Sequence, residues 1–167
     1  KRVDLKNNNE IRATYDHVSA AKLCTTLENK NGVKVSTVEH LLAAFYISEI
    51  DNAVVEIDNE EVPIMDGSAK EFLEEFCKTG LKQLSKKRKY LKVIDNVEFN
   101  DQNKNISIEP SDSSFEVEFE LNYKNKIIGK QKNTINFELD NLDEIYSSRT
   151  FCIFQDIEKI KKLGLAK

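Results

Sequence analysis

The chain has 167 residues, of which 40% are hydrophobic and 32% charged, and its formal net charge is −4. This composition is typical of one or two globular domains, and its mild acidity argues against general binding to nucleic acids or anionic membranes. No stretch approaches the roughly 18 apolar residues of a membrane-spanning helix, so we expect no integral membrane segment.

Three cysteines, Cys24, Cys77 and Cys152, are scattered along the chain. An odd number with such spacing fits neither a disulfide framework nor a cysteine-based zinc site. No secretory signal opens the sequence. We therefore expect a cytoplasmic protein, and we expect a monomer. Because the first residue is not Met and a predicted helix end at Gly164 is followed by almost nothing, we also expect a piece of a longer protein.

The first part of the chain predicts strands followed by a helix. Residues 23–27 and 33–35 flank Asn31-Gly32, a dipeptide favoured in tight hairpin turns. The spacing of an amphipathic helix then follows in Val38, Leu41, Leu42 and Phe45. Ser36, with Glu39 three residues later, predicts a capping box at the start of this helix.

A second helix is predicted after a constrained turn at residues 63–67. Residues 53–57, before this turn, predict an apolar strand that is buried on both faces. After the turn, Ser68 and Glu71 repeat the capping-box pattern. The helix would bury Phe72, Leu73 and Phe76 and would end at Gly80.

The charged stretch 85–89 predicts a solvated linker between two domains, 1–85 and 90–167. Beyond it the pattern predicts strands at 90–99, 105–109, 115–121 and 132–139, and short helices at 140–146 and 156–163. The strand 115–121 alternates apolar residues with glutamates and should be half-buried. The chain therefore predicts two α+β units of similar size.

Glu39 and His40 are the candidates for chemistry, because they are adjacent in the first turn of the predicted helix. The positive field at that end favours a neutral, metal-binding imidazole and an ionised carboxylate. One residue could hold a metal ion while the other takes a proton from water. The alternatives are a carboxylate that only caps the helix and a histidine with an ordinary hydrogen bond. His17 beside Asp16 is better explained as part of a charged surface turn.

Three ordered motifs along the chain carry a family resemblance. The first is Ser-Thr-Val-Glu-His-Leu-Leu-Ala-Ala at 36–44. The second is Ile-Asp-Asn-Ala at 50–53, followed by Glu-Val-Pro-Ile-Met-Asp-Gly-Ser-Ala at 61–69. The third is Ser-Arg-Thr-Phe at 148–151, with Asp-Ile-Glu at 156–158. Together these motifs resemble the UDP-3-O-acyl-N-acetylglucosamine deacetylases. Residues 96–139 contribute the fewest identities to the resemblance.

This resemblance implies specific roles. His40 matches a zinc ligand, Glu39 the general base that deprotonates water, and Thr150 the hydroxyl that stabilises the oxyanion. Substrate contacts are implied for Leu23, Cys24 and Phe151, although Cys24 is equally a small buried hydrophobic residue. Two further residues of the second motif, Asp66 and Gly67, are expected to fix the turn rather than to contact substrate.

The sequence also departs from the family pattern. The family uses a later His and Asp as zinc ligands, a nearby Lys, and another His as general acid, yet no histidine follows His40. One His cannot complete a catalytic zinc site, which needs about three protein ligands. Because the other motifs are intact, we expect an incomplete piece of the enzyme rather than a decayed one, lacking the family's opening segment and truncated in its second domain.

The family fold implied is α+β, with two similar sheet-plus-helix domains whose helices pack between the two sheets. The implied reaction is zinc-dependent hydrolysis of the acetamide of UDP-3-O-acyl-N-acetylglucosamine to a free amine and acetate, the committed step of lipid A biosynthesis. The 167 residues alone are expected to be inactive. The alternative is a non-catalytic binding or scaffold domain that retains the fold without the full metal site.

Overall fold

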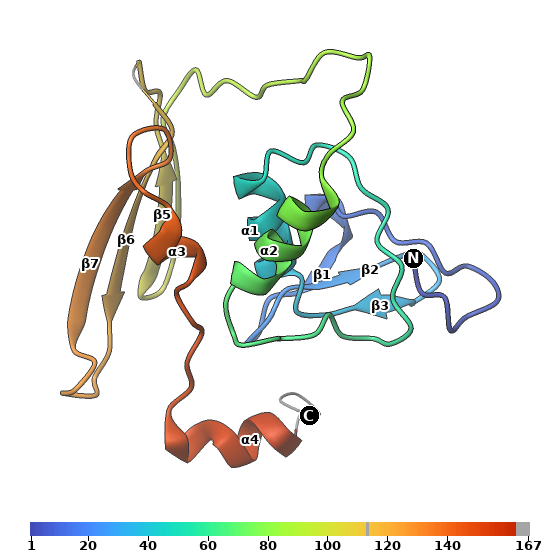
Figure 1. Ribbon diagram of the computed structural model, residues 1–167. Coiled ribbons are helices and arrows are strands. Elements are labelled where there is room, and N and C mark those ends of the chain that lie inside the picture. The colour runs from blue at the N-terminus through green and yellow to red at the C-terminus, as the bar shows by residue number, and fades with distance from the viewer. Residues whose placement is uncertain (113, 163–167) are drawn as a thin grey trace. The chain divides into compact units, whose positions relative to one another are not determined.

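The computed structural model describes residues 1–112 and 114–162 and contains both helices and antiparallel sheets (Figure 1). This confirms the α+β class, while the implied packing of helices between two sheets stays a prediction. The chain forms two compact units, one made of Lys1–Gln83 with the segment from Asp143 onward, the other of Leu84–Leu142. The predicted domain boundaries stay a prediction. The units differ from them in grouping the segment after residue 142 with the first part of the chain.

The first unit contains one antiparallel sheet and all the helices of the described residues. Its elements are η1 (Tyr15–His17), β1 (Val18–Ala20), β2 (Thr26–Glu28), β3 (Lys34–Val35), α1 (Glu39–Ile47), α2 (Lys70–Thr79), α3 (Asp143–Tyr146), η2 (Phe154–Asp156) and α4 (Ile157–Lys162). The sheet has the order β1-β2-β3. No helix in the described ranges has the length and apolar character needed to cross a bilayer.

The hairpin of β2 and β3 confirms the turn predicted at Asn31-Gly32, although its loop is longer than two residues. Glu28 pairs with Lys34, so residues 29–33 form the loop. The side-chain oxygen of Asn29 accepts hydrogen bonds from the N–H groups of Asn31 and Val33, at 3.0 and 3.1 Å. Gly32 has a φ of +78°, a conformation that glycine adopts without steric cost.

Helix α1 packs over this sheet and against α2 (Figure 1). The core between α1 and the sheet consists of Leu27, Val35, Val38, Leu41 and Val62, and the rings of Phe45 and Phe76 stack at 5.1 Å where the two helices meet. The opposite flank of α1 buries Ala44 completely, together with Ala69 and Leu73. Leu42, which was predicted to face the core, is 40% exposed.

The capping box predicted at Ser36 and Glu39 is wrong. Helix α1 begins at Glu39, and its N-cap residue Val38 makes no side-chain capping bond. Tertiary contacts compete for both side chains: Ser36 forms a parallel bridge with Glu61, and its hydroxyl contacts that of Thr26 at 3.1 Å. Glu39 is engaged elsewhere, as described below.

At α2 the second capping pattern is half right. The hydroxyl of Ser68 accepts a hydrogen bond from the N–H of Lys70 at 3.2 Å, but the helix begins at Lys70 and its N-cap residue is Ala69. The predicted end at Gly80 is confirmed, since Gly80 has a φ of +74° and its N–H donates to the carbonyl of Phe76.

Residues 53–57 do not form the predicted buried strand. A single parallel bridge joins Arg2 to Ile57, and Val54 is 83% exposed. Val55 and Ile57 nevertheless pack against the core. A lone bridge supplies too few backbone hydrogen bonds for a regular strand, so the apolar residues of this segment contribute to packing rather than to a sheet.

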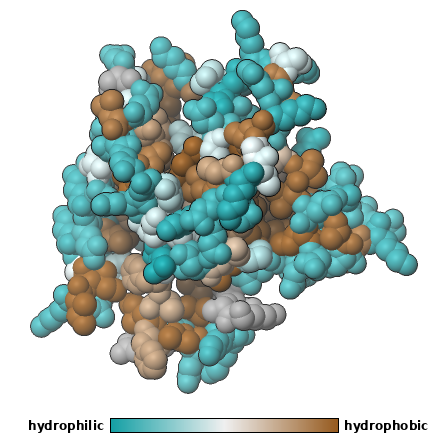
Figure 2. Space-filling view, in the orientation of Figure 1, coloured by the Kyte–Doolittle hydropathy of each residue, from teal (hydrophilic) through white to brown (hydrophobic). Residues whose placement is uncertain are grey.

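The second unit consists of two separate two-stranded antiparallel sheets. They pair β4 (Val97–Asp101) with β5 (Lys104–Ile108), and β6 (Glu116–Asn122) with β7 (Lys130–Asn136). The predicted strand at 90–99 therefore starts only at Val97. The alternation of β6 is confirmed, but Phe119 on its apolar side is 54% exposed. Figure 2 shows apolar side chains reaching the surface among hydrophilic ones.

Candidate functional site

The amino end of α1 carries the two residues predicted to do chemistry. Glu39 is the first helical residue and is exposed, and His40 is half-buried beside it. Oε1 of Glu39 accepts a hydrogen bond from the backbone N–H of Thr25. This bond ties the carboxylate to the segment that precedes β2. Within the described chain, Oε2 of Glu39 and the imidazole of His40 have no hydrogen-bond partner, so both remain available to a ligand.

Leu23 and Cys24 lie in the segment that Glu39 contacts. Leu23 is 63% exposed and has a φ of +70°, which is unusual for a residue with a β-carbon. Cys24 is half-buried, with its Sγ 4.0 Å from Oγ1 of Thr26. The structure thus places two of the three predicted substrate-binding residues in the segment that contacts the predicted base through Thr25. Strained backbone of this kind is often found at functional sites.

Thr37, two residues before Glu39, is also strained and was not predicted to matter. It is buried, its φ is +59°, and its hydroxyl donates a 2.8 Å hydrogen bond to Oε1 of Glu61. A β-branched residue at positive φ costs free energy and persists only where surrounding contacts hold it. No sequence pattern signals this conformation, because it depends on contacts with a segment more than twenty residues away.

Thr150 and Phe151 lie in the segment after α3. The N–H of Thr150 donates to the carbonyl of Gly67 at 2.8 Å, and Nε of Arg149 donates to Oδ2 of Asp66 at 3.2 Å. The side chain of Thr150 is exposed, and Phe151 is 55% exposed. This agrees with the expectation that Asp66 and Gly67 shape a turn, since both hold the backbone that carries Thr150.

The carboxyl of Asp66 has a pKa below its ordinary value. The main cause is the hydroxyl of Ser68, which donates to Oδ1 at 2.6 Å, and the N–H of Ser68 and the side chain of Arg149 add to the effect. All three donors stabilise the ionised form. Asp66 is therefore an ionised acceptor that holds Ser68 and Arg149 at the same turn.

The described residues do not complete a metal centre. No group of three His, Cys, Asp or Glu side chains suited to an ion occurs in residues 1–112 and 114–162. The same ranges contain no hydrogen bond from Thr150 to Glu39 or His40. His40, half-buried with a free imidazole, fits the chemistry of one zinc ligand, whereas a catalytic zinc site takes three.

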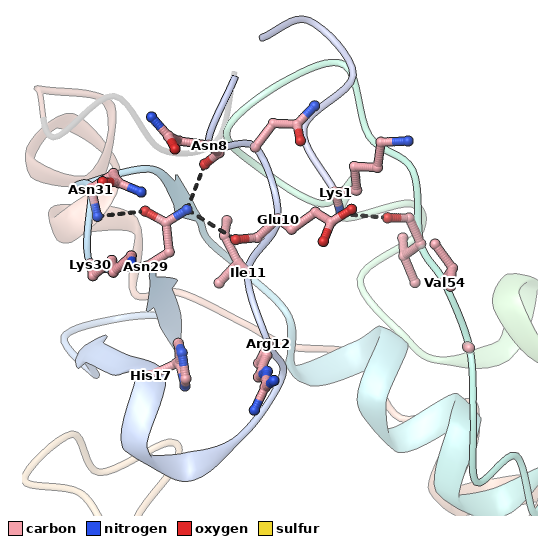
Figure 3. A pocket seen from close by; sticks show the side chains of 13 residues that line it. Lys1, Asn8, Glu10, Ile11, Arg12, His17, Asn29, Lys30, Asn31 and Val54 are labelled. Carbon is pink, nitrogen blue, oxygen red and sulfur yellow. Dashed lines mark hydrogen bonds between the residues drawn. The ribbon is translucent and has the colours of Figure 1, made fainter. Parts of the chain in front are cut away.

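An open cavity of about 770 Å³ lies in a different part of the first unit. It is bordered by Lys1, Arg12, His17 and Val54, among others (Figure 3). Its wall is held together by Asn29, whose side-chain nitrogen donates to the carbonyls of Asn8 and Glu10 at 2.6 and 2.9 Å. None of the predicted catalytic residues lines it.

His17 at the edge of this cavity confirms the expected surface turn. Its Nδ1 lies 2.9 Å from the hydroxyl of Thr14 and 3.2 Å from Oδ1 of Asp16. Both contacts are local in sequence and engage Nδ1, one of the two ring nitrogens.

A sequence model of the UDP-3-O-acyl N-acetylglycosamine deacetylase family matches residues 1–167. Three relatives are each named UDP-3-O-acyl-N-acetylglucosamine deacetylase. That of Geotalea uraniireducens is 40% identical over 99% of this chain and 53% of its own length. For Nautilia profundicola the values are 38%, 93% and 53%, and for Phenylobacterium zucineum 36%, 96% and 55%. The chain spans about half the length of these curated relatives.

The match extends over every motif on which the resemblance rests, from the helix of Glu39 to the segment of Thr150. The chain belongs to the UDP-3-O-acyl N-acetylglycosamine deacetylase family.

Proposed function

We propose that these residues form part of a longer zinc-dependent enzyme that removes the acetyl group from UDP-3-O-acyl-N-acetylglucosamine. The observation that carries the proposal is the placement of Glu39 and His40 at the amino end of α1, with one carboxylate oxygen held by Thr25 and the other free. The names of the relatives supply the substrate. The product would feed lipid A biosynthesis.

Glu39 is assigned the role of general base. The N–H of Thr25 fixes one oxygen of the carboxylate, so the free oxygen keeps a constant direction toward the attacking water. A base positioned in this way accelerates a reaction by about 10²–10⁴-fold. The proton that Glu39 accepts from water must later reach the leaving nitrogen, so that the products are acetate and the amine.

Thr150 is assigned the role of oxyanion donor. Its backbone is anchored on Gly67, which leaves the exposed hydroxyl to donate a hydrogen bond to the negative charge that develops on the carbonyl oxygen. One such donor accounts for about 10²–10³-fold in rate. Leu23 and Cys24 beside Glu39, and Phe151 beside Thr150, would contact the substrate.

Zinc, when bound, would supply a Lewis acid that polarises the carbonyl. His40 would be one of its ligands, and we propose that the other ligands come from residues beyond this chain. We further propose that the whole protein is cytoplasmic and monomeric. Gel filtration would test the monomeric state by a single peak at the mass of one copy.

The test uses the full-length protein that contains these residues. Glu39→Gln removes the base but keeps the size of the side chain, so kcat should fall by about 10²–10⁴-fold with zinc content unchanged. His40→Ala should lower the zinc content. The matched control is Glu74→Gln, which changes an exposed carboxylate on α2 and should leave kcat and zinc content as they are.

Near-normal turnover of Glu39→Gln would remove Glu39 from the role of base. Unchanged zinc content in His40→Ala would remove His40 from the metal site. A folded full-length protein without bound zinc and without turnover would favour the alternative of a binding or scaffold domain.

A further inference from the structure

The backbone that carries Thr150 is attached at two points to the turn at residues 66–69. The N–H of Ala69 donates to the carbonyl of Tyr146 at 3.0 Å, and the N–H of Thr150 donates to the carbonyl of Gly67 at 2.8 Å. Three residues, 147–149, thus lie between two residues that are hydrogen-bonded to the same turn. Because both ends are fixed, the position of Thr150 follows from the position of the turn.

Asp66 adds a side-chain contact to these backbone bonds. Its Oδ2 accepts a hydrogen bond from Nε of Arg149 at 3.2 Å, directly before Thr150. Its Oδ1 accepts from both the N–H and the hydroxyl of Ser68, at 3.0 and 2.6 Å. Ser68 is completely buried and its hydroxyl accepts from the N–H of Lys70 in α2. Asp66 therefore links Arg149 to the fixed start of a helix.

Gly67 is suited to this contact by its lack of a side chain. It is buried, its φ is +87°, and an added β-carbon would lie 3.6 Å from Cγ2 of Thr150. The distance between Gly67 and Thr150 leaves room for a methyl group, but the positive φ would strain any residue with a β-carbon. The turn geometry that presents the Gly67 carbonyl to Thr150 thus depends on glycine.

Residues 60–62, which precede this turn, hold the start of α1. The N–H of Ser36 donates to the carbonyl of Glu60 at 2.8 Å, the N–H of Val62 donates to the carbonyl of Ser36 at 3.0 Å, and Thr37 contacts Glu61. Residues 60–69 consequently touch both the segment before Glu39 and the segment of Thr150. One continuous stretch of backbone connects the two groups that the reaction must bring to a single carbonyl.

We infer that Asp66, Gly67 and Arg149 are positioning residues that place the hydroxyl of Thr150 for the reaction, an inference that rests on the proposed role of Thr150. Arg149 is 67% exposed, and an exposed ion pair contributes little to stability. Its contact with Asp66 therefore serves orientation. A displacement of a catalytic group by about 1 Å can cost about 10²-fold in rate.

The experiment is a double-mutant cycle in the full-length protein with zinc bound. Thr150→Ala should lower kcat by about 10²-fold. Arg149→Gln should lower kcat by about tenfold, with KM and zinc content unchanged, because it loosens Thr150 without touching substrate. In the Thr150→Ala background, Arg149→Gln should have no further effect. Arg149→Lys, which retains a cation, should recover part of the loss.

Lys78→Gln is the matched control, because it breaks another exposed ion pair, that of Lys78 with Glu75 at 2.7 Å, far along α2 from the turn. It should leave kcat unchanged. Gly67→Ala provides an independent perturbation of the same contact. It should lower kcat in the wild-type background and not in the Thr150→Ala background, whatever its effect on thermal stability.

The outcomes separate this inference from the proposed function. If the losses of Arg149→Gln and Thr150→Ala multiply in the double variant, Arg149 does not act through Thr150, and the inference fails while the function stands. A change confined to KM would make Arg149 a substrate-binding residue and would also overturn it. Normal turnover of Thr150→Ala would instead refute the role of Thr150 itself.

Discussion

The hydroxyl of Thr37 donates a hydrogen bond to Oε1 of Glu61 at 2.8 Å, and Thr37 makes this contact from a left-handed backbone conformation with a φ of +59°. The buried hydroxyl fixes the direction in which the chain enters α1. Since Glu39 and His40 follow within three residues, this contact fixes the backbone positions from which both side chains extend.

Thr37→Val should destabilise the full-length protein by about 1–3 kcal/mol, because a nearly isosteric methyl group replaces the donor and leaves the Glu61 carboxylate unsatisfied. Thr37→Ser keeps the hydroxyl and should cost less. Urea unfolding followed by circular dichroism measures both. An unchanged stability of Thr37→Val would show that the hydrogen bond to Glu61 does not stabilise the fold.

Leu23→Gly should raise stability while lowering turnover. Leu23 has a φ of +70° and is 63% exposed, so glycine relieves strain of about 1 kcal/mol and loses little buried surface. The same change frees the segment that holds Glu39 through Thr25. Thermal unfolding and steady-state kinetics on one preparation test both effects, and a loss of stability would contradict the strain argument.

The pKa of Asp66 lies below its ordinary value, so its ionised form stabilises the folded state. This contribution is fully present above the unfolded-state pKa, close to 3.8, and is lost as pH falls through the lower folded-state pKa. Asp66→Asn resembles the protonated acid. The difference in Tm between wild type and Asp66→Asn should therefore be constant near neutral pH and shrink below about pH 4. A pH-independent difference would exclude ionisation as its cause.

Arg2 should be a major determinant of stability in the first unit. It is 5% exposed, its Nε and Nη2 donate to the carboxylate of Asp4 at 2.8 and 2.6 Å, and its Nη1 donates to the carbonyl of Lys34 at 3.0 Å. Arg2→Met preserves the aliphatic part of the side chain but leaves Asp4 and the carbonyl unpaired. The expected cost is about 3 kcal/mol, the lower end for such pairs because Asp4 is 30% exposed. Urea unfolding would measure it, with Lys1→Met as the exposed control.

The 167 residues on their own should bind zinc weakly and should not turn over acylated UDP-N-acetylglucosamine, because the described ranges contain no group of three His, Cys, Asp or Glu side chains that could hold the ion. Isothermal titration with Zn²⁺ and an assay for released acetate would check this. Measurable turnover by the isolated chain would show that it holds a complete site.

Local patterns in the sequence were sufficient for much of the fold. Helical spacing located α1, Gly80 marked the end of α2, and alternation located β6, because each of these signals depends on residues that are close together in the sequence. Long-range contacts explain the failures. Ser36 pairs with Glu61 instead of capping α1, and residues 53–57 form one isolated bridge, with Arg2, instead of a strand.

In the candidate site, too, the local features were predicted from the sequence and the long-range contacts were not. The adjacency of Glu39 and His40 is visible in the sequence, and the family motifs add Thr150. The contact of Glu39 with Thr25 and that of Arg149 with Asp66 join residues 14 and 83 positions apart, and no periodicity predicts such pairs. The left-handed conformations of Leu23 and Thr37 are also hidden, since neither residue type favours them.

The ribbon of β6 and β7 has a practical consequence for handling the protein. Lys130 pairs with Glu120 and Lys132 with Glu118 on one side, whereas Phe119 is exposed. Salt screens such solvent-exposed pairs, and the kosmotropic salts used for precipitation strengthen the association of apolar surfaces. Ammonium sulfate fractionation would thus favour association through the exposed Phe119, so ion exchange at low ionic strength is the gentler purification route.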